Sequence, residues 1–444
     1  MAVAETLAVR ARAVARSGIS PGAVVLAVAV PIIFLHIKYQ LGVRVQLGST
    51  HLALELSDLA VVAVALAAVR EGLRAGFAPL RPALSLWIAA AALLVWIFAR
   101  SQTLEHAVTA AKFGEYALLA LSAPLLLRRR SDWELVAAAI VGWSVVATFV
   151  GLLQIFGADI ADAWAAGRRQ PSFLGHSDFA ALSALALGIG LAAVLLARRR
   201  VGWLAIATGA LGVILSGATA GLIGVAAGTA GLLYATARRR RLVMRDLAVS
   251  AAVVAVVAAG VFTLRAGDFE HFLEFLHVKS EERTTVGVET YSHHTLLAYI
   301  GYRIWRDHPV AGAGWQASDE PATVDPVLPA AHRKFPDVSP LAFPTREHEW
   351  GVQNAYVQSA ADLGLIGLAL WLAPFALALV LALRANAPPG AVATFALVAA
   401  MGVWGGQGLV AGIPLDAVTW LAFGLAATAA AQRTPAVAQG KWRT

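Results

Sequence analysis

The sequence predicts an all-α membrane protein, a polytopic bundle of about twelve transmembrane helices with one large extracytoplasmic loop that contains short helices. Hydrophobic residues make up 59% of the 444 residues and charged residues only 14%. Soluble domains are nearer half apolar and a quarter charged, so the composition excludes an ordinary soluble protein. The apolar segments lack alternating polarity, which favours helices over an outer-membrane barrel.

Each predicted span is an apolar segment of about 20 residues, the length that a helix needs to cross the hydrocarbon. The segments are 22–38, 51–69, 83–99, 107–127, 134–156, 177–197, 202–217, 219–236, 246–264, 352–382, 387–409 and 415–431. The chain therefore divides into a first block of about nine helices at 1–265, a large loop at 266–351, and a last block of about three helices with a cytoplasmic tail at 352–444.

Basic residues gather in every second loop, including 128–130, 198–200 and 238–245. Lys and Arg favour the cytoplasmic side, so these loops and both termini are predicted to be cytoplasmic and the large loop extracytoplasmic. Arginines also precede the first apolar segment, as in a signal peptide, but no small-residue cleavage site follows, so we expect a retained first helix. Topology thus explains the net charge of +8, and we expect no nucleic-acid partner.

The large loop has helical spacing in two places, at 269–278 and at 292–307. In the second helix, leucines and isoleucines form one face, while Arg303 and Arg306 lie on another. A Pro-rich stretch follows at 318–345 and is expected to be irregular. Long irregular loops are more often lids or binding loops than plain connections, so we expect a function for this region.

Several arginines lie on the expected extracytoplasmic side, against the trend of the other loops. Arg168 and Arg169 precede the sixth span in a segment that continues to His176, and Arg303 and Arg306 lie in the loop. Guanidinium groups bind phosphate oxygens in pairs and stay charged, which suits a pyrophosphate at a membrane surface. The alternative is solvated side chains or contacts with lipid headgroups.

Two further groups have residue types that carry chemistry. His348 follows Arg346 between two carboxylates, and a histidine can act as a general base because its pKa lies near neutral pH. The alternative is a surface histidine in an acidic run. Lys112 and Glu115 lie within the fourth predicted span, where ionisable residues usually serve function, although their spacing also permits a mutual ion pair.

The sequence offers no pattern for a metal or nucleotide. His293 and His294 are neighbours and would diverge on a helix, and no HExxH or Cys/His spacing occurs. The chain has no cysteine, so no disulfide holds the large loop. No glycine-rich loop precedes a Lys-Ser/Thr pair. We therefore expect no cofactor, and expect the substrate itself to supply the driving force.

Three segments carry a family resemblance. Residues 169–181 (RQPSFLGHSDFAA) look like a stretch with Arg, Gly-Thr-Phe and Asn-Pro-Asn, and residues 301–315 (GYRIWRDHPVAGAGW) like a helix that ends in Asp-His-Pro-Leu-x-Gly-x-Gly. Residues 353–367 (QNAYVQSAADLGLIG) resemble His-Asn-x-Tyr-Leu followed by Glu-x-Gly-Leu-Ile-Gly. In order, spacing and span layout, most of the chain resembles the O-antigen ligase and O-antigen polymerase superfamily.

The resemblance implies a glycosyltransferase of the bacterial inner membrane that makes cell-envelope polysaccharide or lipopolysaccharide. Such an enzyme moves a glycan from an undecaprenyl-pyrophosphate carrier to an acceptor hydroxyl without metal or nucleotide. Its partners are a lipid-linked oligosaccharide donor and a lipid, glycan or protein acceptor. We expect His348 and Arg303 to be catalytic. We expect pyrophosphate or glycan binding at Arg168, Arg169, His176, Arg306, Arg346, Gln353, Asn354 and Lys112.

Two departures from the family pattern bear on activity. The family histidine is replaced by Gln353, which cannot act as a base, and residues 216–218 read Ser-Gly-Ala where the family often has Ser-Arg-Gly. Either His348 takes over as base, or the chain is a weak or divergent member. We expect a divergent active enzyme that keeps Arg169 and Arg303.

Two rival functions remain. A polysaccharide or lipid transporter would favour an internal repeat with broken helices, and the two halves show no convincing repeat. A non-catalytic scaffold derived from the family would fit the glutamine at position 353. Ligase and polymerase differ only in what presents the hydroxyl, so the sequence favours neither.

Overall fold

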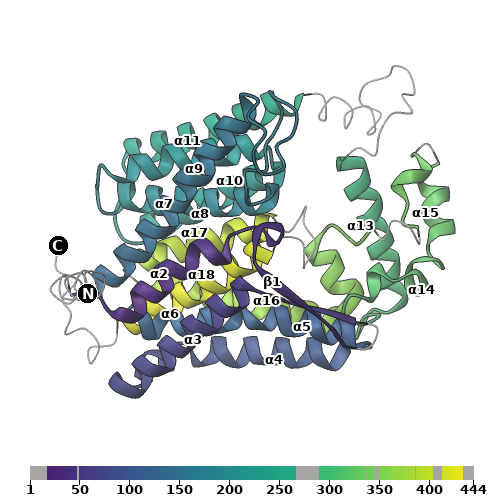
Figure 1. Ribbon diagram of the computed structural model, residues 1–444, viewed down its shortest axis with the longest axis horizontal. Helices are drawn as coiled ribbons and strands as arrows, with labels where there is room; N and C mark the ends of the chain where they lie inside the picture. The colour runs from purple at the N-terminus through teal and green to yellow at the C-terminus, as the bar shows by residue number, and fades with distance from the viewer. Residues whose placement is uncertain are drawn as a thin grey trace.

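The computed structural model describes residues 18–47, 50–266, 290–336, 338–345, 350–385, 387–403 and 413–433. Helices make up most of these residues (Figure 1). Six helical segments are long and apolar enough to cross a membrane, namely Ala78–Arg100, Arg130–Ile155, His176–Leu195, Thr219–Ala237, Met244–Leu264 and Ala355–Arg384. The described residues thus confirm a helical membrane protein, while the count of about twelve spans stays a prediction.

The helices of the first block overlap every segment predicted there. They are α2 (Pro21–Ile33), α3 (Leu56–Ala75), α4 (Leu84–Arg100), α5 (Leu104–Glu115), α6 (Ala117–Leu126), α7 (Arg130–Ile155), α8 (His176–Leu195), α9 (Gly202–Ser216), α10 (Thr219–Ala237) and α11 (Met244–Leu264). One predicted span, 107–127, is divided between α5 and α6 at Tyr116. A short 3-10 turn at Ile37–Tyr39 follows α2, and another at Ala78–Ala83 lies between α3 and α4.

A β-hairpin corrects the all-α prediction. Strand β1 (Gly42–Leu47) pairs antiparallel with β2 (Thr50–Glu55). The sequence-based interpretation placed the second strand inside a span at 51–69, but α3 begins only at Leu56. The helix begins there because the side chain of Asp58 accepts a hydrogen bond from the backbone N–H of Glu55 (2.7 Å).

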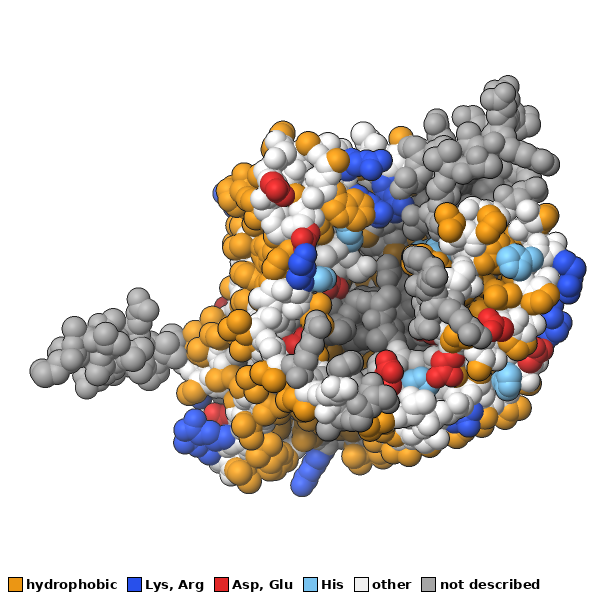
Figure 2. Space-filling model, turned by 45° about the vertical axis from the view of Figure 1, so that its right-hand side comes forward, with side chains coloured by type: hydrophobic (Ala, Val, Ile, Leu, Met, Phe, Trp, Pro, Cys, Tyr) orange, Lys and Arg blue, Asp and Glu red, His pale blue; other side chains and the backbone are white. Residues whose placement is uncertain are grey.

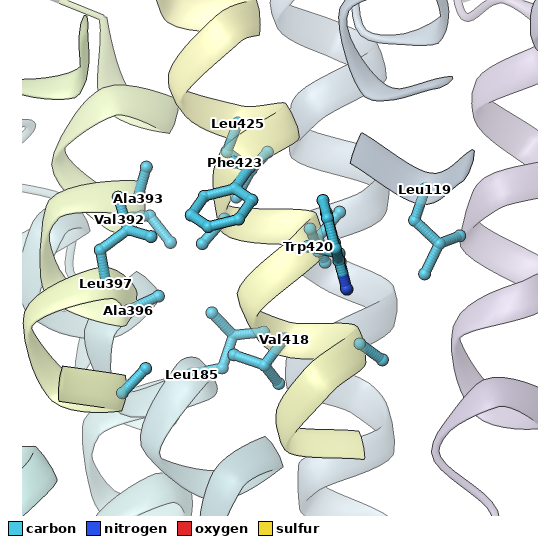
Figure 3. Close-up of a cluster of buried hydrophobic side chains, with 14 of the residues drawn as sticks. Leu119, Leu185, Val392, Ala393, Ala396, Leu397, Val418, Trp420, Phe423 and Leu425 are labelled. Carbon is cyan, nitrogen blue, oxygen red and sulfur yellow. The ribbon is translucent and has the colours of Figure 1, made fainter. Parts of the chain in front are cut away.

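The centre of the bundle is packed through small residues and one aromatic helix. Helices α8 and α9 approach closely, and a Cβ added at Gly190 would lie 2.7 Å from the carbonyl oxygen of Gly202. Helix α18 (Ile413–Ala431) lies between α6, α8, α16 and α17. Its Trp420 and Phe423 are buried, and Figure 3 shows them between side chains of the neighbouring helices.

The segment from residue 290 to 345 forms a small unit of its own, which we call the loop domain. It contains α13 (Thr290–Asp307), α14 (Pro321–Val324), α15 (Leu328–Lys334) and 3-10 turns at Ala317–Asp319 and Pro340–Ala342. Helix α13 confirms the helix expected at 292–307, whereas the expected irregular stretch 318–345 is wrong where these short elements occur. The helix expected at 269–278 lies outside the described residues.

The loop domain has a separate hydrophobic core. Four residues of α13 are buried there against α14, α15 and Phe343, namely Leu296, Leu297, Ile300 and Ile304. These are the residues that the sequence places on one face. Figure 1 shows α13, α14 and α15 together at one side of the bundle. The domain can therefore hold its shape without a disulfide.

The loop domain joins the bundle at a break in α16 (Ala355–Arg384). Gly364 has φ 69° there, a left-handed conformation that interrupts the helix. The backbone groups freed by the break bond to the segment 309–314. Leu365 N donates to Pro309 O (2.9 Å), and Gly314 N donates to Asp362 O (2.9 Å). Two of the three family-like segments thus meet as one structural joint. Helix α17 (Pro388–Val403) follows.

Candidate functional site

The candidate site lies where the loop 157–175, the turn between α9 and α10, and the end of α11 meet. A buried glutamine of α7 holds the first part of this loop. Gln154 Nε2 donates to the carbonyl oxygens of Ile160 (2.6 Å) and Ser172 (3.1 Å), and its Oε1 accepts from Ser172 N (2.8 Å). Buried amide groups of this kind fix a loop because every lost bond leaves an unpaired polar group.

A second buried glutamine connects the loop to the bundle. Gln170 Oε1 accepts from Trp164 N (2.9 Å), and Nε2 donates to the carbonyl oxygen of Arg168 (3.0 Å). The backbone N–H of Gln170 donates to Leu215 O at the end of α9 (2.8 Å). The arginine pair of the loop is thereby held beside the α9–α10 turn.

An ion pair joins the loop to the 3-10 turn Ile37–Tyr39, which follows α2. Lys38 Nζ lies 2.6 Å from Asp162 Oδ1, and Tyr39 OH donates to Asp162 Oδ2 (2.7 Å). Hydrogen bonds from Lys38 and then Tyr39 lower the pKa of Asp162 below its ordinary value. The carboxylate of Asp162 is therefore ionised at neutral pH.

Arg169 lies between Trp164 of the loop and Gly217 of the α9–α10 turn. Its guanidinium carbon lies 4.7 Å from the centre of the Trp164 ring, a cation–π contact. The Trp164 ring in turn lies 4.0 Å from the His176 ring. A Cβ added at Gly217, which has φ 60°, would come within 2.6 Å of Arg169 Cβ. Glycine at this turn lets the arginine lie against it, whereas Arg168 is exposed.

Arg265 reaches the same turn from the other side, and the sequence-based interpretation missed it. It follows α11 directly and is only 6% exposed. Its Nη1 donates to the carbonyl oxygen of Gly217 (3.3 Å) and to Thr219 Oγ1 (3.1 Å). The available signal was an arginine at the expected extracytoplasmic end of an apolar helix, against the positive-inside trend.

Arg169 and Arg265 together are called the cationic group below. Helix α13 brings a histidine towards this group. Burial lowers the pKa of His294 to about 4, and the charges of His293 and Arg265 add to the effect. Figure 2 shows a hollow between the two parts of the molecule, with Lys, Arg and His side chains as well as Asp and Glu side chains at its edge. The loop domain therefore lies close enough to share the site.

An apolar groove with an empty volume of about 560 Å³ begins next to the cationic group. Small side chains of α8, α10 and α17 form its walls, including Ala180, Gly221 and Ala399. Ser177 and Ala218, which follow His176 and Gly217 in the chain, also line it. A charged headgroup site and a narrow apolar groove are thus contiguous.

The other predicted site residues have varied surroundings. Arg303 is half-buried on α13, and its Nε has no hydrogen-bond partner among the described residues. Arg306 is exposed, with Nε 3.6 Å from Asp307 Oδ1. Asn354 caps α16, and its Oδ1 accepts from Val357 N (3.1 Å).

Four more predicted residues belong to the approach to α16 and to the fourth predicted span. Gln353 is half-buried next to the cap of α16, and Arg346 and His348 lie outside the described residues. Lys112 of α5 pairs with Asp58 of α3 and so connects two helices. The binding role predicted for Lys112 stays a prediction.

The fold and the site together define a multi-helix membrane protein with a cationic cluster at the end of an apolar groove. Residues 204–372 match the family described as O-antigen ligase, which supports the O-antigen ligase and polymerase family for this chain. The matched range includes Arg265, Arg303 and the break in α16, whereas Arg169 and His176 precede it. No curated protein matches the sequence significantly.

Proposed function

We propose that the protein is a membrane glycosyltransferase that moves a glycan from an undecaprenyl-pyrophosphate carrier to an acceptor hydroxyl, as a ligase or a polymerase. One observation carries the proposal. Arg169 and Arg265 both contact Gly217, and the apolar groove begins at the next residue, Ala218. A lipid pyrophosphate has the same two parts, an anionic head and an apolar tail.

The chemistry of the donor fits this arrangement. Two guanidinium groups neutralise the charge that develops on the leaving pyrophosphate, and a site removed from water strengthens that effect. The groove is lined mostly by Ala and Gly, an apolar surface of the kind that an isoprenoid chain would contact. Breaking the bond between sugar and pyrophosphate supplies the driving force, so no nucleotide is needed.

The loop domain would contribute from the opposite side of the hollow. Arg303 Nε is buried and has no hydrogen-bond partner among the described residues, and we retain Arg303 as a proposed catalytic residue. Arg306 is exposed on the same helix and would bind the glycan more loosely. His348 stays a hypothesis from the sequence alone.

The decisive experiment measures transfer from undecaprenyl-pyrophosphate-linked oligosaccharide by the purified protein in lipid nanodiscs. Arg169→Ala and Arg265→Ala are each expected to reduce transfer about 100-fold or more, because each removes a charged donor at the leaving group. Binding of inorganic pyrophosphate should weaken in both variants. Arg200→Ala, at an exposed position in a different loop, is the matched control and should behave as wild type.

Normal transfer by both arginine variants would refute the site, and an inactive wild-type protein would refute the function. A transporter would instead move intact donor across a sealed bilayer without any transfer. The broken helix α16 does not favour that alternative. The segment 309–314 occupies backbone groups that the break at Gly364 exposes, and a transporter would use such groups for its substrate.

A further inference from the structure

The tautomer of His176 is set by its neighbour. Its Nδ1 lies 3.2 Å from the carbonyl oxygen of Ser216. A carbonyl oxygen only accepts hydrogen bonds, so Nδ1 carries the hydrogen and Nε2 keeps its lone pair. Nε2 is buried and has no hydrogen-bond partner among the described residues. The fold thus maintains an unpaired basic nitrogen, which costs free energy.

The charges around His176 are mostly positive. Arg169 and Arg265 both act on its ring, and His36 packs against the preceding residue, Gly175. Asp178 lies on the same helix. Burial of the ring and, after it, the two guanidinium groups oppose a positive charge on the imidazole while the site holds no anion. A bound pyrophosphate would offset their charge, so the imidazole would hold a proton more readily once the donor has arrived.

His176 also lies next to both the apolar groove and Arg169. The next residue, Ser177, lines the apolar groove, and the His176 ring contacts the Trp164 ring beside Arg169. A pyrophosphate held by the two arginines therefore brings the first sugar of the glycan close to this ring. Gln353 cannot accept the proton, so the chain needs a base from elsewhere.

We propose that His176 Nε2 is the general base of the transfer, an inference that rests on the proposed function. The proton of the acceptor hydroxyl moves to Nε2 as the acceptor oxygen bonds to the anomeric carbon. The bond from that carbon to the pyrophosphate oxygen breaks, and undecaprenyl pyrophosphate leaves with the electron pair. Binding of the donor thereby makes the His176 imidazole a stronger base.

The test compares His176→Asn with wild type in single-turnover transfer from undecaprenyl-pyrophosphate-linked oligosaccharide in nanodiscs. The asparagine amide keeps an N–H for the Ser216 carbonyl but lacks the basic nitrogen. We expect transfer to fall about 100-fold or more, with binding of inorganic pyrophosphate changed less than about threefold. Wild-type rate should also rise with pH through one ionisation that His176→Asn abolishes.

A second readout separates a base from a residue that only positions its neighbours. A synthetic lipid-linked monosaccharide with fluorine beside its acceptor hydroxyl has a more acidic hydroxyl and needs a base less. The defect of His176→Asn should therefore shrink with this acceptor, whereas a positional defect would not. The control is His332→Asn, at an exposed position on α15, which should leave transfer unchanged.

Each outcome separates this inference from the proposed function. Loss of transfer in Arg169→Ala and Arg265→Ala with normal transfer in His176→Asn would overturn the assignment of the base alone. Removal of the pH-dependent ionisation by His348→Ala, and not by His176→Asn, would give the role to His348. A wild-type protein that transfers nothing would overturn both proposals.

Discussion

At the scale of single residues, His294 of the loop domain has a charge state that is affected by Arg265 of the cationic group. Its folded pKa is about 4, against 6.5 for an unperturbed histidine. Because the folded pKa is depressed, the folded state resists protonation, whereas the unfolded state takes up a proton as the pH falls below 6.5. The stability of this region is therefore highest at neutral pH and decreases between pH 6.5 and about 4.

The expected cost for α13 at pH 5 is about 2 kcal/mol. Hydrogen exchange of the α13 amides, corrected for the intrinsic effect of pH, should show lower protection at pH 5 than at pH 7. His294→Gln cannot titrate and should remove most of the difference. Equal protection at both pH values in the wild-type protein would contradict the assignment.

The arginines show what the sequence reveals of a site. Arg169 was predicted because it breaks the positive-inside pattern in a connecting loop. Arg265 breaks the same pattern, but it directly follows an apolar helix, so the sequence-based interpretation treated it as the last residue of the first block of helices. The contact of both with Gly217 depends on the packing of distant segments, which periodicity alone does not encode.

At the scale of elements, the helices follow from apolar length, while interruptions depend on contacts with other segments. The strand β2 was assigned to a helix because its apolar residues run directly into those of α3. The break in α16 was missed because a single glycine inside a helical pattern does not by itself mark a break. Its left-handed conformation is stabilised by hydrogen bonds to the segment 309–314, about fifty residues earlier in the chain.

Gly364→Ala is expected to destabilise the protein strongly. A Cβ at this position would collide with the carbonyl oxygen of Val310, and φ 69° is unfavourable for alanine. We expect a loss of about 3 kcal/mol or more, seen as a lower midpoint of thermal unfolding in detergent. Gly142→Ala is the control, since nothing lies within 4 Å of its added Cβ. It should leave the midpoint unchanged or raise it; equal effects of both substitutions would argue against the break.

At the scale of the whole molecule, the loop domain and the bundle are held together at several points. His106 Nε2 of α5 lies 3.2 Å from Glu320 Oε1, and Trp315 is buried with its ring 5.9 Å from that of Phe113. Arg100 donates to the carbonyl oxygen of Gly312 (3.0 Å). The loop domain therefore has a defined position on the bundle. These contacts hold it there in addition to the chain connections at its two ends.

The orientation in the membrane can be tested directly because the chain contains no cysteine. Val310 is 60% exposed in the loop domain, and Met244 is 78% exposed at the start of α11, where the positive-inside pattern predicts the cytoplasm. A membrane-impermeant maleimide on intact cells should label Val310→Cys and not Met244→Cys. Labelling in the reverse order would invert the topology, and lysis should expose both.

The joint at Gly364 also imposes an order on biosynthesis. The segment 309–314 leaves the ribosome before α16 does, so the partner for the broken turn already exists when that turn is made. A chain that lacked the earlier segment would leave these backbone groups of α16 without their partners, which is costly wherever water cannot replace them. We therefore expect the last block of the protein to reach its final structure only after the loop domain has been made.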